Sequence, residues 1–302
     1  VRSMAADDLD HDGVPELVTA SMNHQNQWRV YDGDGSEYQG DWPQHEFDSS
    51  TNGYTGSCLN SNIAMGDLDG DSRGEIIGTS DAHSIIAFED DGTQVRASVV
   101  FGQNSDNTSR YWSAVGVNVP LENDLEDYSA CESGSQQVNF ANSAPTISDV
   151  NDDGVDEIVV IGNVYNCDEP YQYVYQSPFI FNYDRTRWVN GNYDWSASPG
   201  YVPGMEPIAQ TIDEIESSQP NPVVIDLDGN DEMEIVFPSF DGKMHAYWLD
   251  KNEHESWPIS VYEEGNPYLS YASEPIFVDF ERDGYAEVIF TTWTGKGSMA
   301  WG

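Results

Sequence analysis

A nine-residue acidic pattern recurs five times along this chain of 302 residues. Written D-x-[DNE]-x-[DN]-x-x-x-E and followed each time by two aliphatic residues, its copies begin at residues 8, 67, 149, 226 and 279. Repetition at intervals of 53–82 residues indicates a repeat architecture, in which each copy marks one supersecondary unit. Such units bury their apolar faces only by packing against one another, so the chain is expected to fold as an array.

The pattern itself predicts a metal loop, whose positions we number 1 to 9. Oxygen-bearing side chains at positions 1, 3 and 5 of a tight loop converge on one point, and Ca²⁺ takes about six to eight oxygen ligands. The EF-hand is excluded, because no copy has Glu at position 12. Glu at position 9 would close the site, and the carbonyl of position 7 would add a backbone oxygen. The predicted side-chain ligands are Asp8, Asp10, Asp12 and Glu16; Asp67, Asp69, Asp71 and Glu75; Asp149, Asn151, Asp153 and Glu157; Asp226, Asp228, Asn230 and Glu234; and Asp279, Glu281, Asp283 and Glu287.

Solvated acidic turns are the alternative to metal loops, and five copies in one register favour the metal. The chain has 54 acidic and 11 basic residues, a net charge of −43, and 22 of the acidic residues lie in the five nine-residue windows. Such a surface repels phosphate backbones and anionic lipid, which disfavours nucleic-acid partners. No apolar run approaches the roughly 20 residues that span a bilayer, so direct membrane insertion is not expected.

Short β-like runs flank each loop, and a third and a weaker fourth run follow. Each loop is therefore expected to join an antiparallel strand pair. Four short strands per repeat are typical of β-propeller blades, which predicts an all-β fold. We expect one propeller domain over residues 1–302, with blades starting near residues 1, 60, 142, 219 and 272 and the last blade lacking its fourth strand.

The motif, the aliphatic strand after it and the turn-rich third strand resemble the FG-GAP/VCBS repeats of integrin-α-like propellers. That resemblance implies up to five structural Ca²⁺ ions on one face and ligand binding on the opposite face. The copies depart from the family at position 9, where Glu replaces Asp, and most strongly in the fifth loop, where Glu281 stands beside Arg282. A closed five-bladed ring and part of a seven- or eight-bladed ring both remain open.

The connections on the face opposite the acidic loops vary most in length, with large insertions at about 102–143 and 162–178. Long loops on a rigid scaffold commonly carry function. Their aromatic side chains suit sugar rings or a protein partner, although the same rings could simply pack the loops onto the blades. The candidate ligand-binding residues are Tyr111, Trp112, Tyr171, Tyr173 and Trp195.

Three cysteines allow at most one internal disulfide. Cys131 precedes the third loop's first strand and Cys167 follows its second strand, so an antiparallel pair would bring both to one rim and favour a bond between them. Cys58 is the alternative partner or the free thiol. A disulfide, with loops that millimolar Ca²⁺ would fill, favours an extracellular or cell-surface location.

No sequence motif indicates a catalytic residue. There is no G-x-S-x-G elbow, no P-loop and no paired histidine motif. A glycosidase-like carboxylate pair could hide around Glu122, Asp124, Glu126 and Asp127, where a solvated acidic stretch is the alternative. The favoured function is a recognition or adhesion module for a glycan or protein. The alternatives are a lyase-like polysaccharide-degrading enzyme, by resemblance alone, and a self-associating subunit of a surface filament or layer.

Overall fold

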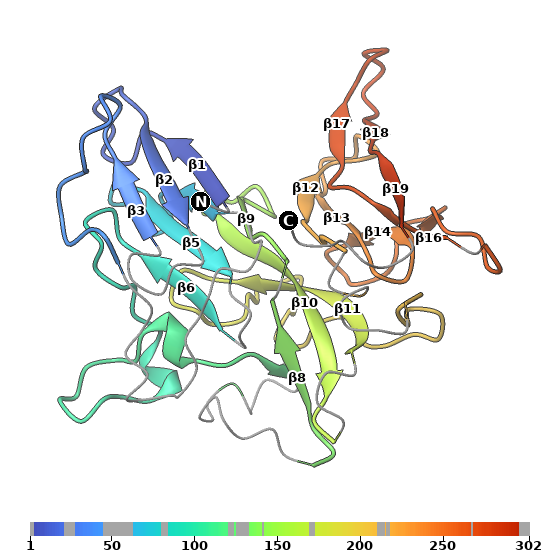
Figure 1. Cartoon of the computed structure of the whole chain (residues 1–302), viewed down its shortest axis with the longest axis horizontal. Coiled ribbons are helices and arrows are strands. Elements are labelled where there is room, and N and C mark those ends of the chain that lie inside the picture. Colours follow the sequence, from blue (N-terminus) through green and yellow to red (C-terminus); the bar gives the residue numbers. More distant parts are fainter. Residues whose placement is uncertain are drawn as a thin grey trace.

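The structure is a computed structural model of the whole chain (Figure 1). It describes residues 3–20, 28–44, 63–79, 84–119, 124, 133–140, 142–168, 173–209, 215, 218–266 and 268–295. Its regular structure is almost entirely strand, which confirms the all-β prediction. Among the described residues, no helix is long and apolar enough to cross a membrane.

Each acidic loop joins two antiparallel strands, as the sequence predicts. The pairs are β1 (Ser3–Asp7) with β2 (Glu16–Ala20), β4 (Ile63–Gly66) with β5 (Glu75–Thr79), β9 (Thr146–Ser148) with β10 (Glu157–Asn166), β12 (Val223–Ile225) with β13 (Glu234–Pro238), and β17 (Ile276–Val278) with β18 (Glu287–Ile289). In every pair the residue before position 1 faces the position 9 glutamate across the ladder. The ladder therefore holds both ends of each loop.

A third strand follows in four of the groups, antiparallel to the second. These strands are β3 (Trp28–Tyr31), β6 (Ile85–Phe88), β11 (Tyr173–Phe181) and β14 (Lys243–Trp248). Among the described residues, the predicted fourth run, which we call the outer run of a blade, forms a regular strand on β14 alone, as β15 (Ile259–Ser260). Next to β3 it makes isolated bridges, and between them Asp41 donates its N–H to the carbonyl of Asp91 in the neighbouring sheet at 2.7 Å. The outer run thus links two sheets.

The insertion at about 102–143, expected as a loop, contributes strands to the third sheet. It holds η2 (Trp112–Ala114), β7 (Asn118–Val119) and β8 (Gln136–Asn139), and the short η1 (Val99–Phe101) precedes it. Strands β10 and β11 are ten and nine residues long, so they continue beyond the end of β9. The half of β10 beyond β9 has backbone groups that need ladder partners. Strand β8 pairs with it, and β7 pairs with β8.

We call the successive sheets blades one to five. They comprise β1–β3, β4–β6, β7–β11, β12–β15, and a last group that adds β16 (Leu269–Ala272) and β19 (Thr292–Gly295) to β17 and β18. The blades follow one another in sequence order around a common centre, as propeller blades do (Figure 1). The run expected as the last blade's third strand lies beyond residue 295, outside the described residues. The single domain, its boundaries and the number of blades in the ring stay predictions.

Alternate residues of each second strand face different neighbours. Ile76, directly after position 9 in blade two, belongs to a buried cluster with Leu9 and Val18 of blade one. The next residue, Ile77, belongs to a cluster with Ile158 of blade three. This alternation follows from the two-residue period of a strand. The core therefore lies between blades, as layers of aliphatic side chains.

The outward faces of the end blades lack this cover. Leu17, which corresponds to Ile76, is 38% exposed. Phe280, which corresponds to the buried Leu9 of the first loop, is 65% exposed. The same positions are buried in the inner blades, where the preceding or following blade of this chain covers them.

Candidate metal centres

The aspartate at position 1 organises the backbone in all five loops. Its Oδ1 accepts the N–H of position 5 at 3.0–3.1 Å, and its Oδ2 accepts the N–H of position 6 at 2.7–3.0 Å. The side chain at position 5 then accepts the N–H of position 7 at 2.7–3.0 Å. The fifth loop, which departs most in sequence, keeps every one of these bonds. The turn geometry is thus common to all five copies.

Two residues in each loop adopt left-handed backbone conformations. Position 6 has φ between 65° and 92°, as the glycines at three of these positions predict. Position 4 is also left-handed, with φ of 57° at His11, Asp152 and Arg282. Glycine stands there only in the second and fourth loops, as Gly70 and Gly229, and it was the one sequence sign of this second turn. The paired left-handed residues curl the loop so that its side chains turn inward.

The glutamate at position 9 closes each loop from the start of the second strand. Its Oε2 accepts the N–H of position 2 in every copy, at distances of 2.7–3.1 Å. This bond fixes the carboxylate across the loop mouth. In the first and fourth loops it lies close to the carboxylates of positions 1 and 3. The four glutamates Glu16, Glu75, Glu157 and Glu234 are buried.

Several of the oxygens aimed into the loops accept no hydrogen bond. Among the described residues, the buried atoms without a donor include Oε1 of Glu75 and Glu234, Oδ1 of Asn151 and Oδ1 of Asp228. Burial of an unpaired polar oxygen is costly, because the atom loses its hydration without compensation. All four atoms lie at positions 3 and 9, where a Ca²⁺ ion would be coordinated. The residues present therefore fit an oxygen-ligated divalent cation.

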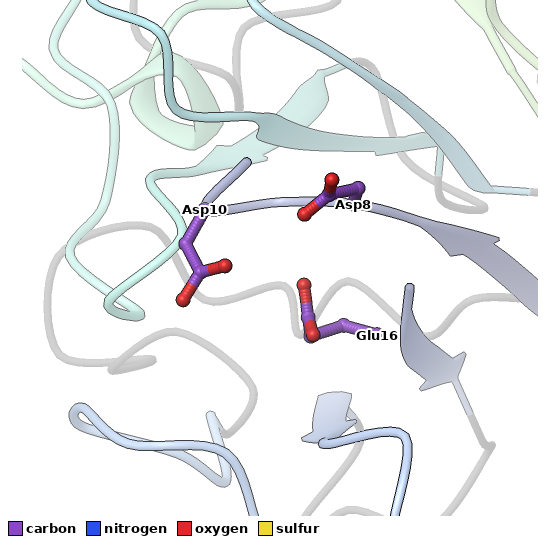
Figure 2. A group of neighbouring side chains, drawn as sticks. All are labelled: Asp8, Asp10 and Glu16. Atoms are coloured by element: carbon purple, nitrogen blue, oxygen red, sulfur yellow. The ribbon is translucent and has the colours of Figure 1, made fainter. Parts of the chain in front are cut away.

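Three loops bring carboxylates close enough to share one ion. The groups are Asp8, Asp10 and Glu16; Asp67, Asp69 and Asp71; and Asp226, Asp228 and Glu234, with ligand atoms that lie within 4.8 Å of one another. Figure 2 shows the first group, in which the three carboxyl groups surround one space between the loop and β2. In the third loop Asn151 Nδ2 donates to Asp153 Oδ2 at 2.9 Å, so its amide already engages a second predicted ligand.

The electrostatics of the loops favour a bound cation. Burial, together with the neighbouring carboxylates of Glu89 and Asp69, raises the pKa of Glu75 to about 8. Burial and the nearby acids of the same loop raise the pKa of Glu157 to about 7, and that of Glu234 to about 7. A carboxyl group with a raised pKa is one whose negative charge is poorly solvated. A divalent cation would supply the counter-charge.

The aromatic residues proposed for ligand binding are mostly part of the core. Trp112, Tyr173 and Trp195 are at most 5% exposed, and Trp195 donates its indole N–H to the carbonyl of Leu249 at 2.9 Å. Tyr111 is half-buried, with the Arg96 guanidinium 4.4 Å from its ring centre. Tyr171 lies outside the described residues. For the three buried rings the alternative applies: they pack connections onto the blades.

Cys167 is disulfide-bonded. Cys58 and Cys131 both lie outside the described residues, so the pairing with Cys131 stays a prediction.

Of the acidic stretch considered for catalysis, the described residue Asp124 is fully buried in an ion-pair cluster. Its oxygens accept hydrogen bonds from Arg187 at 3.0 and 3.1 Å, and Arg185 Nη1 lies 3.8 Å away. Burial lowers the pKa of Arg185 to about 10, against the opposing charge of Asp124. This arrangement corrects the expectation of a solvated or catalytic Asp124, because its carboxylate neutralises two core arginines. Glu122, Glu126 and Asp127 lie outside the described residues.

A family model matches the part of the chain that holds the first two loops. Residues 8–78, which span the first two acidic loops, match the family model of the FG-GAP-like repeat. Among solved structures, the chain is similar to one in the crystal structure of BBS1N in complex with ARL6DN, soaked with lead, with 9% identity and a TM-score of 0.41. That match covers 86% of this chain and 57% of the other. A search of curated proteins found no match.

The family match confirms the resemblance drawn from the acidic motif. The matched residues include both of the first two loops and strands β2 to β4, and they reach into β5. The three later loops, at 149–157, 226–234 and 279–287, repeat the same hydrogen bonds. Residues 8–78 therefore form an FG-GAP-like repeat region, and the rest of the chain continues its loop architecture on a β-propeller-like fold.

Proposed function

We propose that this protein is a Ca²⁺-stabilised recognition or adhesion module that works outside the cell. The observation that carries the proposal is the position 9 glutamate. In all five loops one oxygen of this side chain is bonded to the position 2 N–H, and in the second and fourth loops the other is buried without a donor. Such a group is prepared for a hard cation.

The ions have a structural role in this proposal. Each would neutralise a loop that otherwise holds several repelling carboxylates, so Ca²⁺ binding and folding are coupled. The hairpins carry the loops at one end and the connections between blades at the other. Ions at one end leave the opposite connections free to contact a partner. Millimolar extracellular Ca²⁺ fills loops of modest affinity, and the disulfide at Cys167 suits the same oxidising setting.

Among the described residues of the opposite end, the connection between blades three and four carries an exposed aromatic segment. Tyr201 and Val202 are 42% and 58% exposed. The segment is fixed beneath them, since the Tyr201 ring lies 5.9 Å from that of Tyr175 and Lys243 Nζ donates to the carbonyl of Gly204. A rigidly held, half-exposed tyrosine suits a sugar ring or a protein side chain. We place the ligand contact there.

The Ca²⁺ part is tested by calorimetric melting in 2 mM Ca²⁺, in 2 mM Mg²⁺ and in EDTA. A rise in the melting temperature specific to Ca²⁺ supports the proposal, and indifference to chelation contradicts it.

Ligand recognition is tested on arrays of oligosaccharides and of extracellular matrix proteins. Tyr201→Ala is compared with wild type, and Tyr285→Ala serves as the control because Tyr285 is an exposed aromatic residue at position 7 of an acidic loop. Binding without turnover that is lost only in Tyr201→Ala supports the proposal. Product release from a polysaccharide would instead identify an enzyme.

A further inference from the structure

A buried tyrosine connects the first acidic loop to the second. Tyr38 lies on the outer run of blade one, with its N–H donated to the carbonyl of Val30 at 3.0 Å. Its hydroxyl lies 3.3 Å from Asp10 Oδ2, the position 3 carboxylate of the first loop. The same hydroxyl accepts a hydrogen bond from Arg73 Nη2, also at 3.3 Å. Arg73 is position 7 of the second loop.

A second contact at the same point holds Arg73 in place. Its guanidinium forms an ion pair with Asp90, whose Oδ2 is also 3.3 Å from the Tyr38 hydroxyl. The carbonyl of Asp90 accepts the indole N–H of Trp42 at 2.8 Å, so a side chain of blade one is bonded to the turn that follows β6 in blade two. The backbone N–H of Arg73 donates to Asp71 Oδ1 at 2.8 Å, inside the second loop. Side chain and backbone of Arg73 thus join Tyr38 to the second site.

A tyrosine has one hydroxyl hydrogen, and here two carboxylates compete for it. When the hydroxyl donates to Asp10, its lone pairs remain available to Arg73. An ion that fixes Asp10 in the first loop therefore fixes Tyr38, and with it Arg73. Binding of the first ion already supplies the free energy needed to order Tyr38 and Arg73. An ion that then binds the second loop finds the backbone of that loop already ordered.

The junction of blades three and four is built differently. Here Trp188 stands in the place of Tyr38, Glu232 in that of Arg73 and Leu249 in that of Asp90, as the matching hydrogen bonds show. Tyr193 lies nearby, stacked on Trp188 with ring centres 6.2 Å apart. Within the described residues, no hydrogen bond joins the Tyr193 hydroxyl to an acidic loop. Tyr193 therefore marks a junction that lacks the Tyr38 bridge. In blade four His254 takes the place of Tyr38, and its Nε2 lies 3.6 Å from Oδ2 of Asp228 at position 3 of the fourth loop.

We infer that Tyr38 couples cation binding in the first and second loops, so that the two sites fill cooperatively. The inference rests on the proposed function, since it concerns the same Ca²⁺ sites. Tyr38 is a positioning residue here: its hydroxyl contacts a ligand of one loop and the position 7 side chain of the next. The network predicts positive coupling, with each site binding more tightly when the other is filled.

The coupling is measured by Ca²⁺ titration of the full chain, followed by NMR at one glycine amide in each loop. The N–H groups of Gly13 and Gly70 donate directly to Asp8 and Asp67, so their signals report the first and second sites separately. Asp12→Asn weakens the first loop without touching Tyr38. The dissociation constant of the second loop is compared with and without this change, in wild type and in Tyr38→Phe.

In wild type, Asp12→Asn is expected to weaken the second loop about fivefold or more. In Tyr38→Phe the same change should alter it less than about twofold, because the bridge is gone. Tyr193→Phe, the matched control, should keep the wild-type coupling. A Tyr38→Phe protein that binds Ca²⁺ with unchanged coupling overturns the inference and leaves the proposed function standing. Absence of Ca²⁺ binding in wild type overturns both.

Discussion

Gly78 on β5 lies directly against the indole of Trp28 on β3, so that a β-carbon at Gly78 would lie 2.1 Å from Cη2 of that ring. The missing side chain is what lets blade one press its tryptophan against blade two. Gly78→Ala should therefore destabilise the protein by about 1–3 kcal/mol, the usual cost of overpacking a core. Urea unfolding in the presence of Ca²⁺ measures it.

Gly191→Ala is the control for that change. A β-carbon at Gly191 meets nothing within 4 Å, and its backbone is not left-handed. Alanine there should be neutral or stabilising by about 0.4–1 kcal/mol, through loss of unfolded-state entropy. Equal losses of stability at Gly78 and Gly191 would contradict the close blade contact.

Glu234→Gln should have opposite effects with and without metal. In EDTA the variant should be at least as stable as wild type, because the substitution removes a poorly solvated charge whose pKa is raised by burial. In excess Ca²⁺ the free energy of unfolding of the variant should rise less than that of wild type. A tenfold weaker site would lower this metal-dependent stabilisation by about 1.4 kcal/mol. Chemical unfolding of both proteins at several Ca²⁺ concentrations measures the difference.

Glu232→Gln is the matched control in the same loop, because Glu232 is exposed at position 7 and contributes only its backbone carbonyl to the predicted site. It should leave the Ca²⁺ response close to that of wild type. A loss of response equal to that of Glu234→Gln would show that loop charge, and not the position 9 carboxylate, governs binding.

Without metal, stability should fall as the pH rises. The folded-state pKa values of Glu75, about 8, and of Glu157 and Glu234, about 7, lie above their ordinary value. The folded chain thus binds protons that the unfolded chain releases, and this stabilisation is complete below about pH 4.5 and lost through pH 7–8. Melting scans in EDTA from pH 5 to 8 should show the decline, and scans in Ca²⁺ should be flatter. A metal-free protein that becomes more stable toward pH 8 would contradict the burial of these charges.

Asp124→Asn should cost about 3–5 kcal/mol, because it leaves the buried Arg185 and Arg187 without a counter-charge. Glu37→Gln, which breaks the exposed pair of Glu37 with Arg29 at 3.6 Å, should cost about 1 kcal/mol or less. Denaturant unfolding of both variants compares the two pairs. Similar small losses would show that the core cluster is tolerant of an unpaired charge.

The sequence was sufficient for the strand pairs and their loops, because both depend on residues within nine positions of one another. The Asp67 carboxylate bonds N–H groups four and five residues ahead, and Glu75 closes the same loop eight residues on. Spacing alone therefore predicts the turn. The left-handed residue at position 4 was missed where His11 or Arg282 stands there, since nothing in these side chains signals a positive φ.

Contacts between distant segments could not be predicted. Trp195 and Trp112 are aromatic residues in long connections, which is typical of a binding surface. In the structure both are buried. The position of Asp124 between two arginines 61 and 63 residues away depends on how the insertion folds over blade three. The same holds for β8, which could be assigned only once the length of β10 was known.

The bond between successive loops has a wider consequence. The carbonyl of Leu9 accepts the N–H of Gly74, and that of Leu227 accepts the N–H of Ala286, so one loop helps to seat the next. An ordered loop therefore stabilises the ordered conformation of the loop bonded to it. Within the described residues this bond joins the first loop to the second and the fourth loop to the fifth, so a disturbance in one loop of such a pair reaches its partner directly. We therefore expect the acidic loops to lose their order as neighbouring pairs, the first with the second and the fourth with the fifth.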